Sequence, residues 1–119
     1  MSDFGDKLKT RTTQFALRVI KMTNALPRNP AGKVLGHQVL RSATSIGANY
    51  REAYRARSSA EFLSKMGDCL KESEETGYWL ELIEAARLLS AMKLTALQKE
   101  NSELTALFVT IIKSKKSAL

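Results

Sequence analysis

Lysine and arginine residues recur at helical spacing along the first half of the chain, and the chemistry they offer is the binding of phosphate groups. Spacings of three, four and seven residues place side chains on one face of a helix. Residues 1–60 carry eleven basic and three acidic groups. Clustered cations attract polyanions, and nucleic acid is the first candidate. The predicted nucleic-acid-binding residues are Lys7, Arg11, Arg18, Lys21, Lys33, Arg41, Arg51, Arg55 and Arg57.

The remainder of the chain offers a second interpretation of these cations. Residues 61–90 carry three basic and seven acidic groups, although the whole chain has a net charge of +7. Two basic stripes, the first over Lys7–Lys21 and the second over Lys33–Arg55, could pair with Asp68, Glu72 and Glu75 of another copy, or bind the acidic surface of a partner protein. Two hypotheses therefore stand side by side: an RNA-binding protein, which we favour, and an oligomeric protein–protein adaptor.

A line of polar residues borders the second basic stripe. Ser45, Asn49 and Glu52 follow the i, i+4, i+7 rhythm of a helix face. Serine and asparagine are poor helix formers, so their presence in mid-helix needs a reason. They either contact an RNA backbone or a neighbouring subunit, or they simply face water.

Catalytic and metal-binding chemistry has few candidates in this sequence. His37 is the single histidine and Cys69 the single cysteine, so neither a catalytic dyad nor a protein zinc site is expected. No glycine-rich phosphate loop occurs. We therefore predict that the protein is not an enzyme and uses no metal or cofactor. One cysteine, no apolar run of about 20 residues and no signal-peptide pattern favour a cytoplasmic protein without a membrane partner.

Four helices must position these side chains. The only prolines, Pro27 and Pro30, mark a loop, and Asn29 can cap the helix that follows. Ser58 and Glu61 have the spacing of a capping box. We predict one domain, residues 1–119, with helices at 4–26, 30–56, 59–88 and 93–114. Short connections between amphipathic helices favour an all-α, antiparallel up-and-down four-helix bundle.

Apolar residues at helical spacing identify the expected core. In the first predicted helix, Leu8, Phe15, Val19, Met22 and Leu26 share one side, and Ile20 is expected to widen this apolar side. Ser73, Thr76 and Gly77 place small side chains on the core side of the third helix, which permits close helix approach. The main apolar positions are Leu8, Phe15, Val19, Met22, Leu26, Leu35, Val39, Ala43, Ile46, Tyr50, Ala53, Phe62, Met66, Cys69, Leu70, Leu94, Leu97, Leu104, Leu107, Phe108 and Ile111.

The second half of the third helix is apolar in nearly every direction. Such a helix must be covered on more than one side, and Trp and Tyr are favoured at protein interfaces. Tyr78, Trp79 and Leu82 are therefore predicted to form an oligomer interface. The alternative is that the tryptophan folds back beneath the loop that follows.

Three motifs give the sequence a family resemblance. They are Arg41-x-x-x-Ser45-Ile46-x-x-Asn49, then Arg57-Ser58-x-x-Glu61-Phe62, then a Glu-rich helix with Glu72, Glu75 and Tyr78-Trp79. The chain resembles the four helix bundle proteins, also called 23S rRNA-intervening sequence proteins. The resemblance implies a four-helix bundle assembled as a homopentamer, with no established catalytic residues. It also implies nucleic-acid binding, because the related accessory protein of diversity-generating retroelements binds nucleic acid and a reverse transcriptase. The family motif falls on Arg41, Ser45, Asn49, Glu52, Arg57, Glu61 and Phe62.

Overall fold

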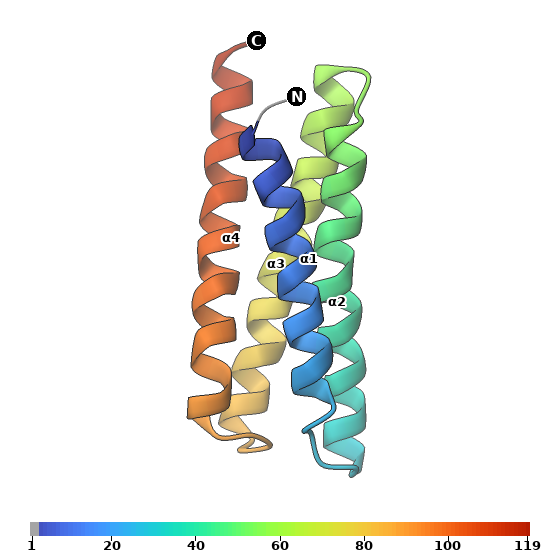
Figure 1. Ribbon diagram of the computed structural model, residues 1–119, viewed down its shortest axis with the longest axis vertical. Coiled ribbons are helices and arrows are strands. Elements are labelled where there is room, and N and C mark those ends of the chain that lie inside the picture. The colour runs from blue at the N-terminus through green and yellow to red at the C-terminus, as the bar shows by residue number, and fades with distance from the viewer. Residues whose placement is uncertain (1–2) are drawn as a thin grey trace.

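The fold is an all-α, antiparallel four-helix bundle, with both described ends of the chain at the same end of the molecule (Figure 1). The computed structural model describes residues 3–119. The helices are α1 (Asp3–Thr23), α2 (Pro30–Tyr54), α3 (Ser59–Ala85) and α4 (Ala91–Ser117). The bundle measures 48 × 22 × 19 Å, so it is a long rod. None of its helices combines the length and apolar character that crossing a membrane requires.

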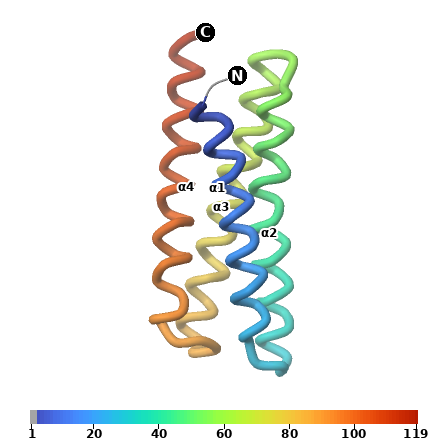
Figure 2. Tube along the Cα trace, in the orientation of Figure 1, coloured from blue at the N-terminus to red at the C-terminus, as the bar shows by residue number. Residues whose placement is uncertain are grey.

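The helices follow one another around the bundle. The four helices run along one another over the length of the bundle (Figure 2). The α2 helix packs against both α1 and α3, and α3 packs against α4, while α1 and α4 contact each other less. The chain thus closes a ring of neighbours in sequence order, which is the arrangement that short connections favour.

Two predicted caps set where α2 and α3 begin. The Asn29 side chain accepts a hydrogen bond from the Gly32 N–H at 2.8 Å, and Pro30 takes the first helical position. The Ser58 hydroxyl accepts from the Glu61 N–H at 3.0 Å, while the Glu61 carboxylate accepts from the Arg57 N–H at 3.1 Å. The first three helices end two or three residues before the predicted ends, and α4 extends from 91 to 117.

The turn between α3 and α4 forms without glycine or proline. Arg87 adopts the left-handed conformation with φ of 56°. The Leu88 N–H donates to the Ile83 carbonyl at 3.1 Å, and the Arg87 N–H donates to the Glu84 carbonyl at 2.9 Å. This pair of hydrogen bonds is a Schellman motif, in which glycine usually occupies the left-handed position. A side chain there costs about 1 kcal/mol, which packing of Leu88 against the core offsets.

The core matches most of the predicted apolar positions. Phe15, Val19, Val39, Ile46 and fourteen other hydrophobic residues are buried. The prediction for Ile20 was wrong, since its side chain is 40% exposed. At roughly 100° per residue, position 20 is turned away from the direction in which Phe15 and Val19 point, toward the outside of the bundle.

A polar layer crosses the core between α2, α3 and α4. The Thr76 hydroxyl hydrogen bonds to the Ser42 hydroxyl at 2.8 Å, and the Asn101 amide donates to the Ser73 carbonyl at 3.0 Å. A Cβ on Gly77 would lie only 3.1 Å from the Asn101 amide nitrogen, so glycine permits this close approach. The small residues of α3 thus lie on the core side as predicted, whereas a buried asparagine within the leucine repeat of α4 was not foreseen.

Candidate nucleic-acid interface

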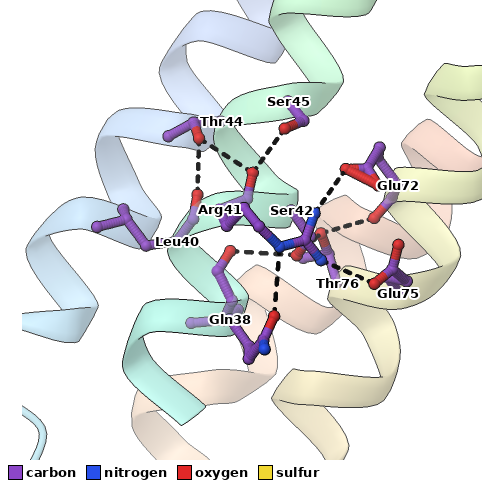
Figure 3. Close-up of polar contacts among 10 residues, drawn as sticks. Gln38, Leu40, Arg41, Ser42, Thr44, Ser45, Glu72, Glu75 and Thr76 are labelled. Carbon is purple, nitrogen blue, oxygen red and sulfur yellow. Dashed lines mark hydrogen bonds and ion pairs between the residues drawn. The ribbon is translucent and has the colours of Figure 1, made fainter. Parts of the chain in front are cut away.

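Arg41, one of the predicted nucleic-acid-binding residues, is held by carboxylates of its own chain. It lies on α2 and reaches across to α3 (Figure 3). Its Nη1 donates to Glu72 Oε2 at 3.3 Å, and its Nη2 donates to Glu75 Oε1 at 2.8 Å. Its Nε donates to the Gln38 side chain at 3.2 Å. The guanidinium therefore joins two helices, and its contact with a phosphate would compete with two ion pairs.

Glu72 is the most buried of these carboxylates, with a side chain 11% exposed. Burial raises the pKa of Glu72, and the hydrogen bond and negative charge of Glu75 raise it further. The positive charge of Arg41 opposes that shift. Arg41 thus holds together two carboxylates that would otherwise repel each other at the seam of α2 and α3.

Arg11 is paired in the same way at the seam of α1 and α4. Its Nε and one Nη donate to the two oxygens of Glu100, both at 2.8 Å, and Nη2 also lies 2.8 Å from Glu103. Bidentate pairing of this kind is the strongest form of an arginine–carboxylate contact. It raises the pKa of Arg11 through the hydrogen bond with Glu100.

The other predicted cations are exposed, and Lys7 alone among them has an ion pair within the described residues. Lys7 pairs with Asp3 at 3.1 Å, but both side chains are more than three-quarters exposed, so water and salt weaken the contact. Arg51 makes a 3.3 Å hydrogen bond to the Thr13 hydroxyl, which leaves its charge unneutralised. Within residues 3–119 no carboxylate forms an ion pair with Arg18, Lys21, Lys33, Arg51, Arg55 or Arg57.

These unpaired cations lie in three places. Arg18 and Lys21 line a shallow groove between α1 and α4 together with Lys93. Lys33 borders the loop between α1 and α2. The third set, Arg51, Arg55 and Arg57, is at the end of α2 and is called the end cluster below. Arg55 caps the end of α2, where its N–H donates to the Arg51 carbonyl at 3.3 Å, and Arg55 and Arg57 line one hollow with Glu52 and Glu61.

Comparison with known proteins identifies the family. A family model described as 23S rRNA-intervening sequence protein matches residues 7–110. The chain belongs to the 23S rRNA-intervening sequence protein family. No curated protein matches it at a significant level.

A solved relative has the same fold. It is a Bacteroides thetaiotaomicron protein with unknown function from the S23 ribosomal protein family. The two sequences are 36% identical, the match covers 92% of this chain and 97% of the other, and the TM-score is 0.85. The four-helix bundle of this 23S rRNA-intervening sequence protein is thus shared with a relative whose structure was determined by crystallography.

The polar motif residues of this 23S rRNA-intervening sequence protein contact its own chain. The Ser45 hydroxyl donates to the Arg41 carbonyl at 2.8 Å, as Figure 3 shows. Glu52 pairs with Lys65 of α3 at 3.6 Å, and Glu61 caps α3. The side chain of Asn49 is half-buried and makes no hydrogen bond within residues 3–119. Three of the four motif residues therefore contribute to α2, α3 or the link between them.

The predicted oligomer interface is partly exposed. Tyr78 is 52% exposed, and its ring centroid lies 5.1 Å from that of Trp79. Trp79 is half-buried against the core, and Leu82, about one turn further along α3, is also half-buried. The Trp79 indole N–H is buried without a hydrogen-bond partner among the described residues. Packing within the bundle thus covers part of the apolar surface of α3, whereas the Tyr78 side chain remains exposed.

The single histidine and the single cysteine lie in different surroundings. His37 is exposed on α2. Cys69 is buried in the core, and burial raises the pKa of its thiol to about 12, so a reactive thiolate does not form near neutral pH. Within residues 3–119 no three of the side chains His, Cys, Asp and Glu come together as a metal site would require.

The carboxylates that bind Arg11 were not predicted from the sequence. Glu100 and Glu103 lie about ninety residues away on α4, and their spacing only indicates an exposed helix face. No local signal pairs them with Arg11, because that contact depends on how α1 and α4 are rotated against each other.

Proposed function

We propose that this family member is a non-enzymatic RNA-binding protein of the cytoplasm that acts as a homo-oligomer, and that its end cluster binds RNA phosphates. One observation supports this above all others: Arg51, Arg55 and Arg57 are exposed, close in the chain and without a carboxylate ion pair in residues 3–119. Arg11 and Arg41 pair with carboxylates between helices, whereas the end cluster holds three exposed arginines close together that are available for another molecule.

The physical basis of binding is electrostatic. Each phosphate neutralised by Lys or Arg releases condensed counterions, so affinity falls steeply as salt rises. Arginine suits this role because its planar guanidinium binds phosphate oxygens through two N–H groups at once. The net charge of +7 adds attraction over a longer range. Such contacts read shape and backbone, so weak sequence specificity is expected.

Homo-oligomerisation would multiply these contacts. Several copies, five in the arrangement that the family resemblance implies, present several end clusters, and linked weak contacts give strong overall binding. The partly exposed Tyr78 and Leu82 on α3 support a contact between copies, since aromatic residues are enriched at interfaces.

Sedimentation velocity tests this contact with a matched control. We expect the wild type to sediment as an oligomer and the Tyr78→Ser/Leu82→Ser variant as a smaller species. Met92→Ser removes a side chain that is 89% exposed at the start of α4, and it should leave the assembly unchanged. A monomeric wild type would contradict the oligomer.

RNA binding is tested by fluorescence anisotropy across a salt series, with labelled structured RNA, single-stranded RNA and duplex DNA. The Arg51→Ala/Arg55→Ala variant should bind more weakly and with a shallower salt slope, by about 0.7–0.9 for each phosphate that is no longer neutralised. The Lys71→Ala/Lys99→Ala variant removes the same formal charge from α3 and α4, so it serves as the control. No binding by the wild type at low salt would contradict the proposal and favour the adaptor hypothesis.

A further inference from the structure

A groove opens at the end of the bundle where α1 starts. The α1 helix has 21 residues, whereas α3 and α4 have 27 each. At a rise of 1.5 Å per residue, α1 is about 9 Å shorter than α4. The end of α4 extends beyond the start of α1 (Figure 1). A groove of about 760 Å³ lies between the start of α1, the end of α2, the start of α3 and the end of α4.

Aromatic rings line this groove. The chain has eight aromatic residues, and four of them, Phe4, Tyr50, Tyr54 and Phe62, lie along the groove. The volume falls within the roughly 300–1,000 Å³ of small-molecule sites. Phe4 is 51% exposed, so its ring is open to a ligand, while Tyr50 is buried and hydrogen bonds to the Gly5 carbonyl at 3.2 Å. Phe4 is therefore the ring best placed to contact a molecule in the groove.

The charged residues of the groove are all cationic. Arg57 and Lys115 line it, and none of its fourteen lining residues is Asp or Glu. The Lys115 ammonium lies 5.5 Å from the Phe62 ring centroid, so cation and ring are already together. Asp6, just outside the lining, is bound by the Tyr54 hydroxyl at 2.7 Å. Arg57 also belongs to the end cluster, which makes the groove continuous with the proposed RNA-binding surface.

We propose that this groove binds an unpaired base of the RNA, which stacks on Phe4 while Arg57 and Lys115 contact the flanking phosphates; this inference rests on the proposed function. Aromatic rings beside cations are the usual means of holding single-stranded nucleic acid, since every base has a π face. An acidic peptide would also suit the two cations. The rings favour a base, because apart from Ile111 the nonpolar lining is aromatic, alanine or glycine, with little aliphatic surface for a peptide side chain.

The test uses a hairpin RNA with 2-aminopurine in its loop. Stacking quenches this fluorescent base, so we expect quenching when the wild type binds and loss of quenching with Phe4→Ala. Affinity for the loop should fall about tenfold in that variant, the loss typical of one stacked base. Leu17→Ala is the control, because Leu17 is also 51% exposed on α1 but lies outside the groove.

A second pair of variants tests the phosphate contact. Lys115→Ala should weaken hairpin binding and flatten its salt slope, whereas Lys99→Ala, on the same helix outside the groove, should change neither. Both are exposed or half-exposed side chains, so folding is expected to survive and is checked by circular dichroism.

The outcomes separate this inference from the proposed function. Wild-type binding and quenching that Phe4→Ala leaves unchanged would overturn the groove but keep the RNA-binding protein. Failure of the wild type to bind any RNA would overturn both. If an acidic peptide displaces the bound RNA from the wild type, and binding of that peptide is lost in Phe4→Ala, the groove would be assigned to a protein partner instead.

Discussion

Arg41 and Arg55 lie in the same basic stripe of the sequence, but their surroundings differ. Arg41 bridges α2 and α3 through Glu72 and Glu75 (Figure 3). Arg55 follows the last residue of α2 and has no ion pair within residues 3–119. One basic stripe of the sequence therefore contains both a structural arginine and an available one. They differ in whether the neighbouring helix supplies a carboxylate that pairs with the arginine.

The packing of α2 on α3 explains the difference. The Thr76 hydroxyl of α3 hydrogen bonds to Ser42 of α2, and next to that contact Arg41 lies opposite Glu72 and Glu75. Arg55 follows the end of α2 and shares a hollow with Glu61 at the start of α3, but within residues 3–119 it forms no ion pair with that carboxylate. We therefore expect substitution of Arg41 to lower the free energy of unfolding more than substitution of Arg55 does. Stability measurements on the two variants test this difference.

The largest expected effect on stability is that of Arg41→Ala. Without the guanidinium, Glu72 and Glu75 are left as two neighbouring carboxylates, one of them nearly buried. We expect the free energy of unfolding at pH 7 to fall by about 2 kcal/mol, between the values for exposed and buried pairs. Urea denaturation measures it. A loss below about 0.5 kcal/mol would place Arg41 with the available cations.

A smaller loss is expected for Arg11→Lys. Lysine keeps the charge but cannot donate two parallel N–H groups to Glu100 while also reaching Glu103. We predict destabilisation of about 1 kcal/mol, which lowers the melting temperature by a few degrees. Thermal melting followed by circular dichroism is the measurement. An unchanged melting temperature would show that the two parallel hydrogen bonds from Arg11 to Glu100 do not contribute to stability.

Glu72→Gln tests the buried carboxylate through pH. Burial and Glu75 raise the pKa of Glu72 in the folded state, so the folded protein binds this proton more tightly than the unfolded chain does. Its favourable contribution is present at pH values below the ordinary pKa of 4.5 and is lost as pH rises through the raised folded value.

The measurable consequence is a difference between two stability profiles. From pH 4.5 towards pH 7 the wild type should lose stability relative to Glu72→Gln. The control is Glu74→Gln, an exposed position on the same helix without an ion pair in residues 3–119, which should show no such trend. If the wild type instead gains stability relative to Glu72→Gln over this range, the positive charge of Arg41 lowers the pKa of Glu72 more than burial raises it.

The smallest effect is expected at Arg55. Removal of its exposed side chain breaks no ion pair in the described residues, so Arg55→Ala should change the free energy of unfolding by less than about 0.5 kcal/mol. Denaturation alongside Arg41→Ala gives the direct contrast. A loss comparable to that of Arg41→Ala would erase the distinction between the two arginines.

Local signals in the sequence were sufficient for much of the fold. The caps at Asn29 and Ser58 depend on residues within four positions, and both form. Helical periodicity placed Phe15 and Val19 in the core, because burial follows the face of each helix. The turn at Arg87 was harder, since a left-handed arginine is stabilised by tertiary packing of Leu88 and leaves no residue-type signal.

The candidate site could be predicted only in part. Sequence spacing grouped the cations by helix, but the pairing of Arg11 with Glu100 depends on contacts between helices distant in the chain. The groove at Phe4 and Phe62 lies where the end of α4 extends beyond the start of α1 (Figure 1). Helix ends are the least predictable part of a helical sequence, so this feature appears only in three dimensions.

The central claim is that available and paired arginines have different functions, and one comparison of salt slopes tests it. RNA affinity is measured from low to moderate salt for Arg51→Ala/Arg55→Ala and for Arg11→Ala/Arg41→Ala, at a temperature where both are folded. Each variant loses two formal charges. We predict that the first has a shallower slope than the wild type, while the second keeps the wild-type slope despite its lower stability. Equal reductions of the slope in both variants would mean that net charge alone governs binding and would contradict the account.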